Sequence, residues 1–142
     1  MSVFDVARYI LEKKGPMSTW KLQKLCYYSQ AWTIAWGEDP LFGEDFQAWA
    51  NGPVCPELFY QHKGVYIVRP EMIKGDSSKL LPEQKENIDI VLDGYGDKEA
   101  YWLREQTHSE APWKDARGDL PEGEPSQQVI SKESMGLYYG SL

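Results

Sequence analysis

Cysteine, histidine and long apolar runs are all scarce in this chain of 142 residues. Its two cysteines, Cys26 and Cys55, are too few for a disulfide scaffold. No apolar run approaches the roughly 18 residues that a membrane-spanning helix needs. The first residues, MSVFDVARYILEKKG, carry an acid early and mix polar with apolar side chains, so they do not resemble a signal peptide. We therefore expect a cytoplasmic domain with both thiols free and no membrane partner.

Positive charge is also in deficit, because 15 Lys and Arg residues face 22 Asp and Glu residues, for a net charge of −7. Residues 1–70 are balanced, with seven of each sign, whereas residues 71–142 carry eight basic and fifteen acidic side chains. An acidic surface repels a phosphate backbone, so unaided binding of nucleic acid is disfavoured. A basic partner would be attracted, although an acidic, solvated surface also needs no partner.

Sequence signatures of metal and cofactor sites are missing as well. There is no glycine-rich phosphate loop and no dinucleotide-binding fingerprint. Cys26, Cys55, His62 and His108 are the right residue types for zinc, but every gap between them is seven residues or more. Structural zinc sites instead build on closely spaced pairs, since a short turn aims two ligands at once. We predict no metal and no cofactor, with the thiols buried as small apolar groups.

A cysteine nucleophile is one alternative that the sequence leaves open. Cys55 directly precedes Pro56, at the start of an expected helix, and a helix N-terminus stabilises a thiolate. His62 or His108 could act as the base, oriented by Asp115. No known nucleophile signature surrounds Cys55, so a Cys/His-dependent hydrolase is the alternative and the main prediction has no catalytic residue.

Apolar spacing predicts a mainly α, compact single-domain fold over residues 1–142, with one small β-hairpin or extended segment. The segment 44–50 alternates as a strand does, and 65–70 is expected to pair with it or to remain extended. A rigid Asn-Gly-Pro turn follows the strand at 51–53, and 118–125 is a loop by composition. Helices are expected to begin after Ser2, after Ser18, at Pro56, at Pro82, after Asp97, after Ser109 and after Ser131.

The second helix, from Ser18 to about Trp36, carries side chains beyond its apolar stripe that suggest a further contact. Gln23, Lys24, Tyr27, Tyr28 and Gln30 lie off the stripe, which implies packing against another helix or against a partner. With the helix before it, this segment also resembles a helix–turn–helix, in which Lys21, Gln23 and Lys24 would face the bases. No adjoining basic patch supports that arrangement, so a DNA-binding prophage regulator is a second alternative.

Aromatic residues are abundant, at 13% of the chain with six Trp and nine Tyr. Trp, Tyr and Arg are the residues that protein interfaces use as anchors. Packing in the core is the alternative for each of them, and for His108 and Arg117 that alternative is a polar bridge with Asp115 or Glu110. The residues we predict to bind a partner are Tyr27, Tyr28, Trp32, Trp49, Asn51, Pro53, Trp113 and Arg117.

Four segments in order carry a family resemblance: MSTWKLQKLCYYSQAWTIAW (17–36), PLFGEDFQAWANGPVCPELFYQHKG (40–64), LPEQKENIDIVLDGYGDKEAYWLREQTHSEAPWKDARG (81–118) and the closing MGLYYGSL. Their order and spacing resemble the SocA-like, Panacea-domain family of antitoxins. The resemblance extends from about Asp5 to the C-terminus and implies one Panacea domain over 1–142. One local departure is Leu81, which stands before Pro82 where a helix-capping Ser or Thr would be expected.

The resemblance implies a bacterial or prophage protein of the cytoplasm that neutralises a co-encoded toxin by binding it. Members of this family accept diverse toxins, and at least one resembles a proteolytic adaptor that delivers its toxin to a Clp-type protease. Many members carry an additional DNA-binding segment, whereas this chain begins directly with the domain. The resemblance therefore implies a cognate toxin, and in addition a Clp-type protease, as partners.

Overall fold

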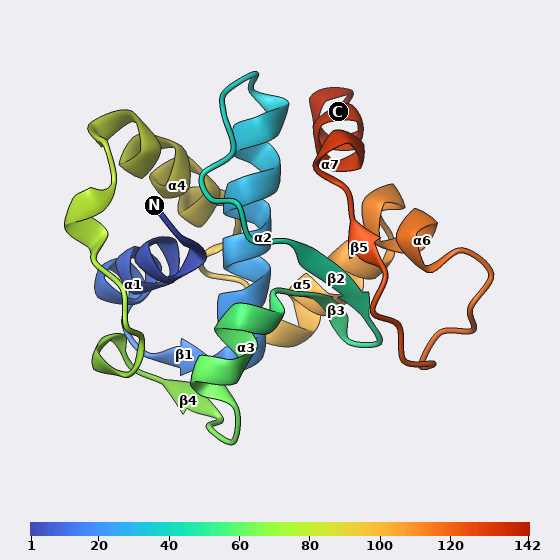
Figure 1. Cartoon of the computed structure of the whole chain (residues 1–142), viewed down its shortest axis with the longest axis horizontal. Coiled ribbons are helices and arrows are strands. Elements are labelled where there is room, and N and C mark those ends of the chain that lie inside the picture. Colours follow the sequence, from blue (N-terminus) through green and yellow to red (C-terminus); the bar gives the residue numbers. More distant parts are fainter.

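Helix α2 (Thr19–Ala35) runs through the middle of the molecule in the computed structural model, which describes residues 1–142 (Figure 1). Ser18 caps it by accepting a hydrogen bond from the Lys21 amide at 3.2 Å. Helices α1 and α4 lie to one side of α2, and α5, α6 and α7 lie to the other. The other helices span Val3–Lys14 (α1), Pro56–His62 (α3), Pro82–Tyr95 (α4), Ala100–His108 (α5), Ala111–Arg117 (α6) and Lys132–Gly140 (α7).

The mainly α prediction is confirmed, together with most of the predicted helix starts. Two caps differ from the prediction. Ser109 closes α5, its amide bonded to the Glu105 carbonyl, so Glu110 rather than Ser109 stands before α6. Asp97 still belongs to the turn after α4, where it pairs with Lys14, and Glu99 stands before α5.

The strands form two small antiparallel sheets rather than one hairpin. The segment 65–70 was expected to pair with 44–50 or to remain extended, but its strand β4 pairs with β1, placing buried Val68 opposite buried Met17. Strand β2 instead takes β3, only two residues further along, because closing so short a loop costs little entropy. The strands are β1 (Met17–Ser18), β2 (Phe46–Trp49), β3 (Gly52–Val54), β4 (Ile67–Val68) and β5 (Val129–Ile130), and the three-stranded sheet has the order β3-β2-β5.

Residues 52–54 therefore form a strand, not the rigid Asn-Gly-Pro turn that the sequence suggested. The two-residue loop is Ala50–Asn51, and the positive φ of the hairpin is carried by Gly52, at 118°. Pro53 pairs with Ala48 in β3, the edge strand, where a missing N–H is tolerated.

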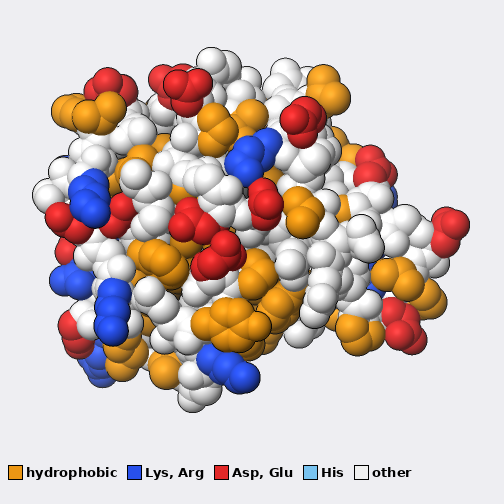
Figure 2. Space-filling model, viewed as in Figure 1, with side chains coloured by type: hydrophobic (Ala, Val, Ile, Leu, Met, Phe, Trp, Pro, Cys, Tyr) orange, Lys and Arg blue, Asp and Glu red, His pale blue; other side chains and the backbone are white.

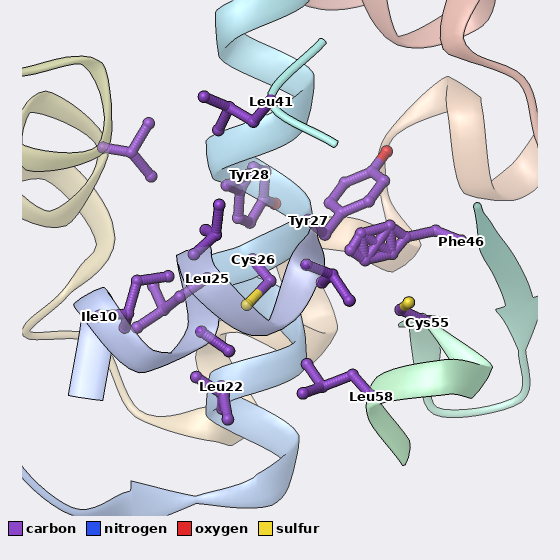
Figure 3. Close-up of a cluster of buried hydrophobic side chains, with 14 of the residues drawn as sticks. Ile10, Leu22, Leu25, Cys26, Tyr27, Tyr28, Leu41, Phe46, Cys55 and Leu58 are labelled. Carbon is purple, nitrogen blue, oxygen red and sulfur yellow. The ribbon is translucent and has the colours of Figure 1, made fainter. Parts of the chain in front are cut away.

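The core surrounds α2 on nearly every face, and Figure 3 shows its side chains meeting those of α1, α3 and β2. Leu22, Leu25 and Cys26 are fully buried on the predicted apolar stripe. Tyr27 and Tyr28 are buried as well, although they lie off that stripe. The second contact of α2 is thus supplied by other parts of the same chain, chiefly α7 and α4.

The surface shows Asp and Glu side chains over the middle of the face in Figure 2, with hydrophobic side chains gathered below them over α3. Tyr60, on α3, is 73% exposed. None of the helices combines the length and the apolar character that crossing a membrane requires.

Candidate partner-binding site

Tyr27 and Tyr28 belong to a buried hydrogen-bond network rather than to a surface. Tyr28 and Tyr139 each donate to Glu110 Oε1 at 2.8 Å. The Tyr139 hydroxyl also lies 3.1 Å from that of Tyr27, and because its single proton goes to Glu110, Tyr27 is the donor of that pair. Burial raises the pKa of all three phenols well above the usual value. A partner docking on this conformation cannot contact Tyr27 or Tyr28, which corrects their assignment as anchors.

Trp113 and Arg117 are also buried, and their polar groups hold the hairpin in place. Trp113 Nε1 donates to the Trp49 carbonyl at 2.9 Å, and Arg117 Nη1 donates to the Ala48 carbonyl at 2.9 Å. Arg117 Nη2 also donates to the carbonyls of Pro121 and Glu124, at 3.0 and 2.6 Å. These two residues therefore position strand β2 and the loop 118–125 and offer little surface of their own.

His108 makes a different contact from the predicted bridge. Its ring stacks on Trp113 with the centroids 3.9 Å apart, and its Nδ1 lies 3.3 Å from Glu122 Oε1. Arg117 bonds to backbone carbonyls, so neither residue bridges to Asp115 or Glu110 as the sequence suggested.

Cys55 lacks the surroundings of a nucleophile. Its side chain is fully buried, and burial raises the pKa of the thiol to about 12. The only side-chain group that hydrogen-bonds to the thiol is Glu57 Oε1, which accepts from Sγ at 3.7 Å. His62 hydrogen-bonds to the Gln23 side chain rather than to the thiol, with 3.0 Å between Gln23 Nε2 and His62 Nε2. The same Gln23 amide donates to the Cys55 carbonyl and accepts from the Cys55 amide. The arrangement fixes the start of α3 and does not activate the thiol.

The two other ligand hypotheses can be compared with the structure directly. No group of three His, Cys, Asp or Glu side chains lies close enough to hold a metal ion, and both cysteines are buried free thiols. Lys21 is half-buried, but Gln23 and Lys24, the other two residues expected to read bases, are buried inside the protein. Side chains in that position cannot reach a DNA groove.

A groove of about 290 Å³ opens beside the tip of the β2–β3 hairpin. Trp49, half-buried, packs on Phe59 with the ring centroids 5.0 Å apart and presents its other side to the groove. Asn51 is exposed at the tip, whereas Pro53 is buried beneath it. We call this space the hairpin groove; it is lined by Trp20, Trp49, Ala50, Asn51, Pro125, Ser126 and Gln127.

A second pocket, of about 240 Å³, shares Trp20 and Asn51 with the hairpin groove. Lys24 reaches it from α2 and is 1% exposed, yet its ammonium has no hydrogen-bond partner and no carboxylate beside it. Burial, together with the nearby charge of Arg104, lowers the pKa of Lys24 to about 7. We call this space the Lys24 pocket; it is lined by Trp20, Lys24, Asn51, Ala100, Tyr101 and Arg104.

Trp32 lies elsewhere, in an apolar groove of about 410 Å³ between α2 and α4. Its Nε1 donates to the Tyr95 hydroxyl at 3.1 Å, which leaves the ring half-buried. Trp36 and Ile90, which are 42% and 50% exposed, complete the opening. The predicted anchors Trp32 and Trp49 thus lie in two separate grooves.

Comparison with known families decides the assignment. The model of the family described as "Antitoxin SocA-like, Panacea domain" matches residues 22–114, well over half of the chain. The chain belongs to this family. A search of curated proteins and a search of solved structures each found no match.

The matched range of the Panacea domain includes most of the residues around the hairpin. Lys24, Trp49, Asn51 and Arg104 fall within residues 22–114, whereas Trp20 and the loop at Pro125 lie outside. Of the eight residues predicted to bind a partner, Trp32, Trp49 and Asn51 remain accessible, and their role in binding stays a prediction.

Trp20, Tyr101 and Arg104 were not predicted as lining residues. Lys24 was predicted only to pack against a helix or a partner from outside the apolar stripe, or to read bases in a helix–turn–helix. One signal was available in the sequence, because Lys24 shares the face outside the apolar stripe with Tyr27 and Tyr28, and that face was expected to be covered. A lysine at such a position is buried at a cost unless something pairs with it. Nothing in the sequence indicated that α5 would bring Arg104 and Tyr101 to the same place.

Proposed function

We propose that this Panacea-domain protein is a non-enzymatic antitoxin of the bacterial cytoplasm, which neutralises a co-encoded toxin by direct binding at the hairpin groove. The observation that carries the proposal is that the family match includes Trp49 and Asn51, the accessible residues of the hairpin. We also propose that residues 1–142 form one domain, because α1 and α7, outside the matched range, pack directly on α2.

The hairpin groove has the properties of an interface centre. Trp20 and Trp49 provide rigid aromatic surface, and hydrogen bonds from Trp113 and Arg117 hold the hairpin before any partner arrives. Preorganised aromatic residues bind at a low entropic cost because few rotamers must be frozen. Neither the hairpin groove nor the groove between α2 and α4 contains a charged residue, but the hairpin groove shares Trp20 and Asn51 with a pocket that holds Lys24 and Arg104, which could select a partner.

The test is co-expression with the product of the neighbouring open reading frame. The unaltered protein should restore growth and co-purify with the toxin. Trp20→Ala should weaken binding on the order of 30-fold, as expected for loss of an aromatic anchor. Trp36→Ala is the matched control, because it removes a tryptophan from the opposite end of α2, roughly 24 Å away.

Two results would contradict the proposal. If Trp36→Ala abolished binding while Trp20→Ala did not, the groove between α2 and α4 would be the interface. If a toxic neighbour never co-purified with the unaltered protein, neutralisation by binding would be wrong.

Occlusion is the mechanism that we propose, and delivery to a Clp-type protease is the alternative. The toxin's half-life in strains with and without that protease separates the two, since occlusion predicts no difference.

A further inference from the structure

Lys24 is the most unusual charged residue of the molecule. Its ammonium group is buried, makes no hydrogen bond and lies 5.1 Å from the centre of the Trp20 ring. The charged and titratable groups that face it are Arg104 and His108 on α5 and His62 on α3. None of them is an anion. A buried cation without a counter-charge is costly, and such groups are normally paired.

The pocket into which Lys24 points is suited to an anion in three ways. Arg104 adds a second positive charge, although it also pairs with Glu105 at 2.9 Å. The first turn of α5 contributes Ala100 and Tyr101, and no side chain caps that helix end. Amides at an uncapped N-terminus carry partial positive charge and lack partners. Lys24 itself is 1% exposed, and a charge pair formed with so deeply buried an ammonium is strengthened because little water screens it.

We propose that the Lys24 pocket is an anion site that receives a carboxylate side chain, Asp or Glu, of the bound toxin. This inference rests on the proposed function, because the pocket shares Trp20 and Asn51 with the hairpin groove. The two spaces adjoin, so one protein docked on that groove would lie next to the pocket as well. A carboxylate fits better than a phosphate dianion, since Arg104 is partly neutralised by Glu105 and one buried ammonium remains.

The first measurement is the affinity of Lys24→Met for the purified co-encoded toxin. Methionine keeps the length of the side chain and removes the charge, so the toxin carboxylate would be buried without a partner. Affinity should fall on the order of 30-fold or more. Lys21→Met is the matched control, because it removes a charge one turn away that does not line the pocket, and it should change affinity by less than about threefold.

The second measurement identifies the carboxylate. Each Asp and Glu of the toxin is replaced by Asn or Gln and tested against both the unaltered antitoxin and Lys24→Met. One toxin substitution should weaken binding to the unaltered protein and add almost nothing in the Lys24→Met background. If every toxin substitution added fully to Lys24→Met, the pairing would be wrong even though the antitoxin function stood.

The third measurement is the number of protons taken up when the complex forms, which a lysine with only a structural role would not change. Pairing with a carboxylate favours the charged form of Lys24, so complex formation at pH 8 should take up about one proton. Calorimetry in two buffers of different ionisation enthalpy counts that proton, and Lys24→Met should take up none. Equal uptake by both proteins would overturn the inference. Absence of any toxin binding by the unaltered protein would overturn the proposed function and this inference with it.

Discussion

At the scale of single residues, Lys24 sets a pH dependence of stability. Its pKa is about 7 in the folded protein, whereas the ordinary pKa of a lysine is 10.5. Between these values the unfolded chain binds more protons than the folded one, so the free energy of unfolding rises with pH in that window. At pH 7 the buried lysine lowers stability by at most about 4 kcal/mol.

We therefore predict that Lys24→Met is more stable than the unaltered protein at pH 7, by a few kcal/mol. The difference in the free energy of unfolding should shrink steadily between pH 7.5 and 9.5. Over this range the pH approaches the pKa of Lys24 in the unfolded chain, so unfolding gains less and less from protonation of the lysine. Urea unfolding across this range measures both effects, with Lys21→Met as the control for loss of a charge. A Lys24→Met protein that was less stable at pH 7 would show that the ammonium already has a partner within the fold.

Individual side chains also show where reasoning from sequence ended. The spacing on α2 correctly placed Leu22, Leu25 and Cys26 in the core. The spacing did not decide whether Tyr27 and Tyr28 pack against another helix of the chain or against a partner. A periodic pattern indicates that a helix face is covered but not what covers it. Glu110, which accepts from Tyr28 and Tyr139, is 82 and 29 residues away from them along the chain, so only the tertiary fold reveals that network.

At the scale of elements, the β2–β3 hairpin depends on the contact between Gly52 and Lys24. Gly52 has a φ of 118°, and a Cβ added there would lie 2.6 Å from Lys24 Cε. Gly52→Ala should therefore strain the backbone and also displace the lysine stem from its cradle. Gly123→Ala is the matched control, because Gly123 has a φ of 101° and open space around it.

Both substitutions should destabilise the protein by about 1 kcal/mol or more through backbone strain. Gly52→Ala should cost more than Gly123→Ala, and the excess should vanish when Lys24→Met is introduced as well, since a thioether can shift without leaving a buried charge. Urea unfolding of the unaltered protein, Gly52→Ala, Lys24→Met and the double variant forms the cycle that measures this coupling. Equal costs in both backgrounds would mean that the close approach does not constrain Lys24.

Strand pairing was the element-level feature least accessible from the sequence. Alternation identified the strand at 46–49, and proline correctly marked the start of α3 at Pro56. The partner of 67–68 could not be read in the same way, because its choice of Met17–Ser18 depends on how α1 and α2 are joined. Local patterns indicate that a segment is extended, whereas pairing is decided by which edges the whole fold leaves free.

At the scale of the whole molecule, we infer that the family-matched range is not a complete folding unit. Residues 22–114 contain most of α2, but α1 and α7 cover two of its sides and lie outside that range. Helix α7 packs closely, because a Cβ on Gly136 would lie 3.2 Å from Ile34. It also supplies Tyr139, whose hydroxyl completes the buried network on Glu110. Removing α7 would expose apolar surface on α2 and leave polar groups of the core unpaired.

We therefore predict that a chain ending at Gln128, which lacks β5 and α7, loses cooperative unfolding. It would lose the buried side chains of Ile130, Met135 and Tyr139, each of which costs about 2 kcal/mol or more to remove from a core. That sum approaches the whole stability of a domain this size.

Near-ultraviolet circular dichroism and urea unfolding measure the outcome. A chain lacking only Ser141 and Leu142, both exposed, is the control and should unfold as the full chain does. Cooperative unfolding of the chain ending at Gln128 would show instead that α7 is an appendage, and that the covering of α2 by α1, α4 and α5 suffices for the fold.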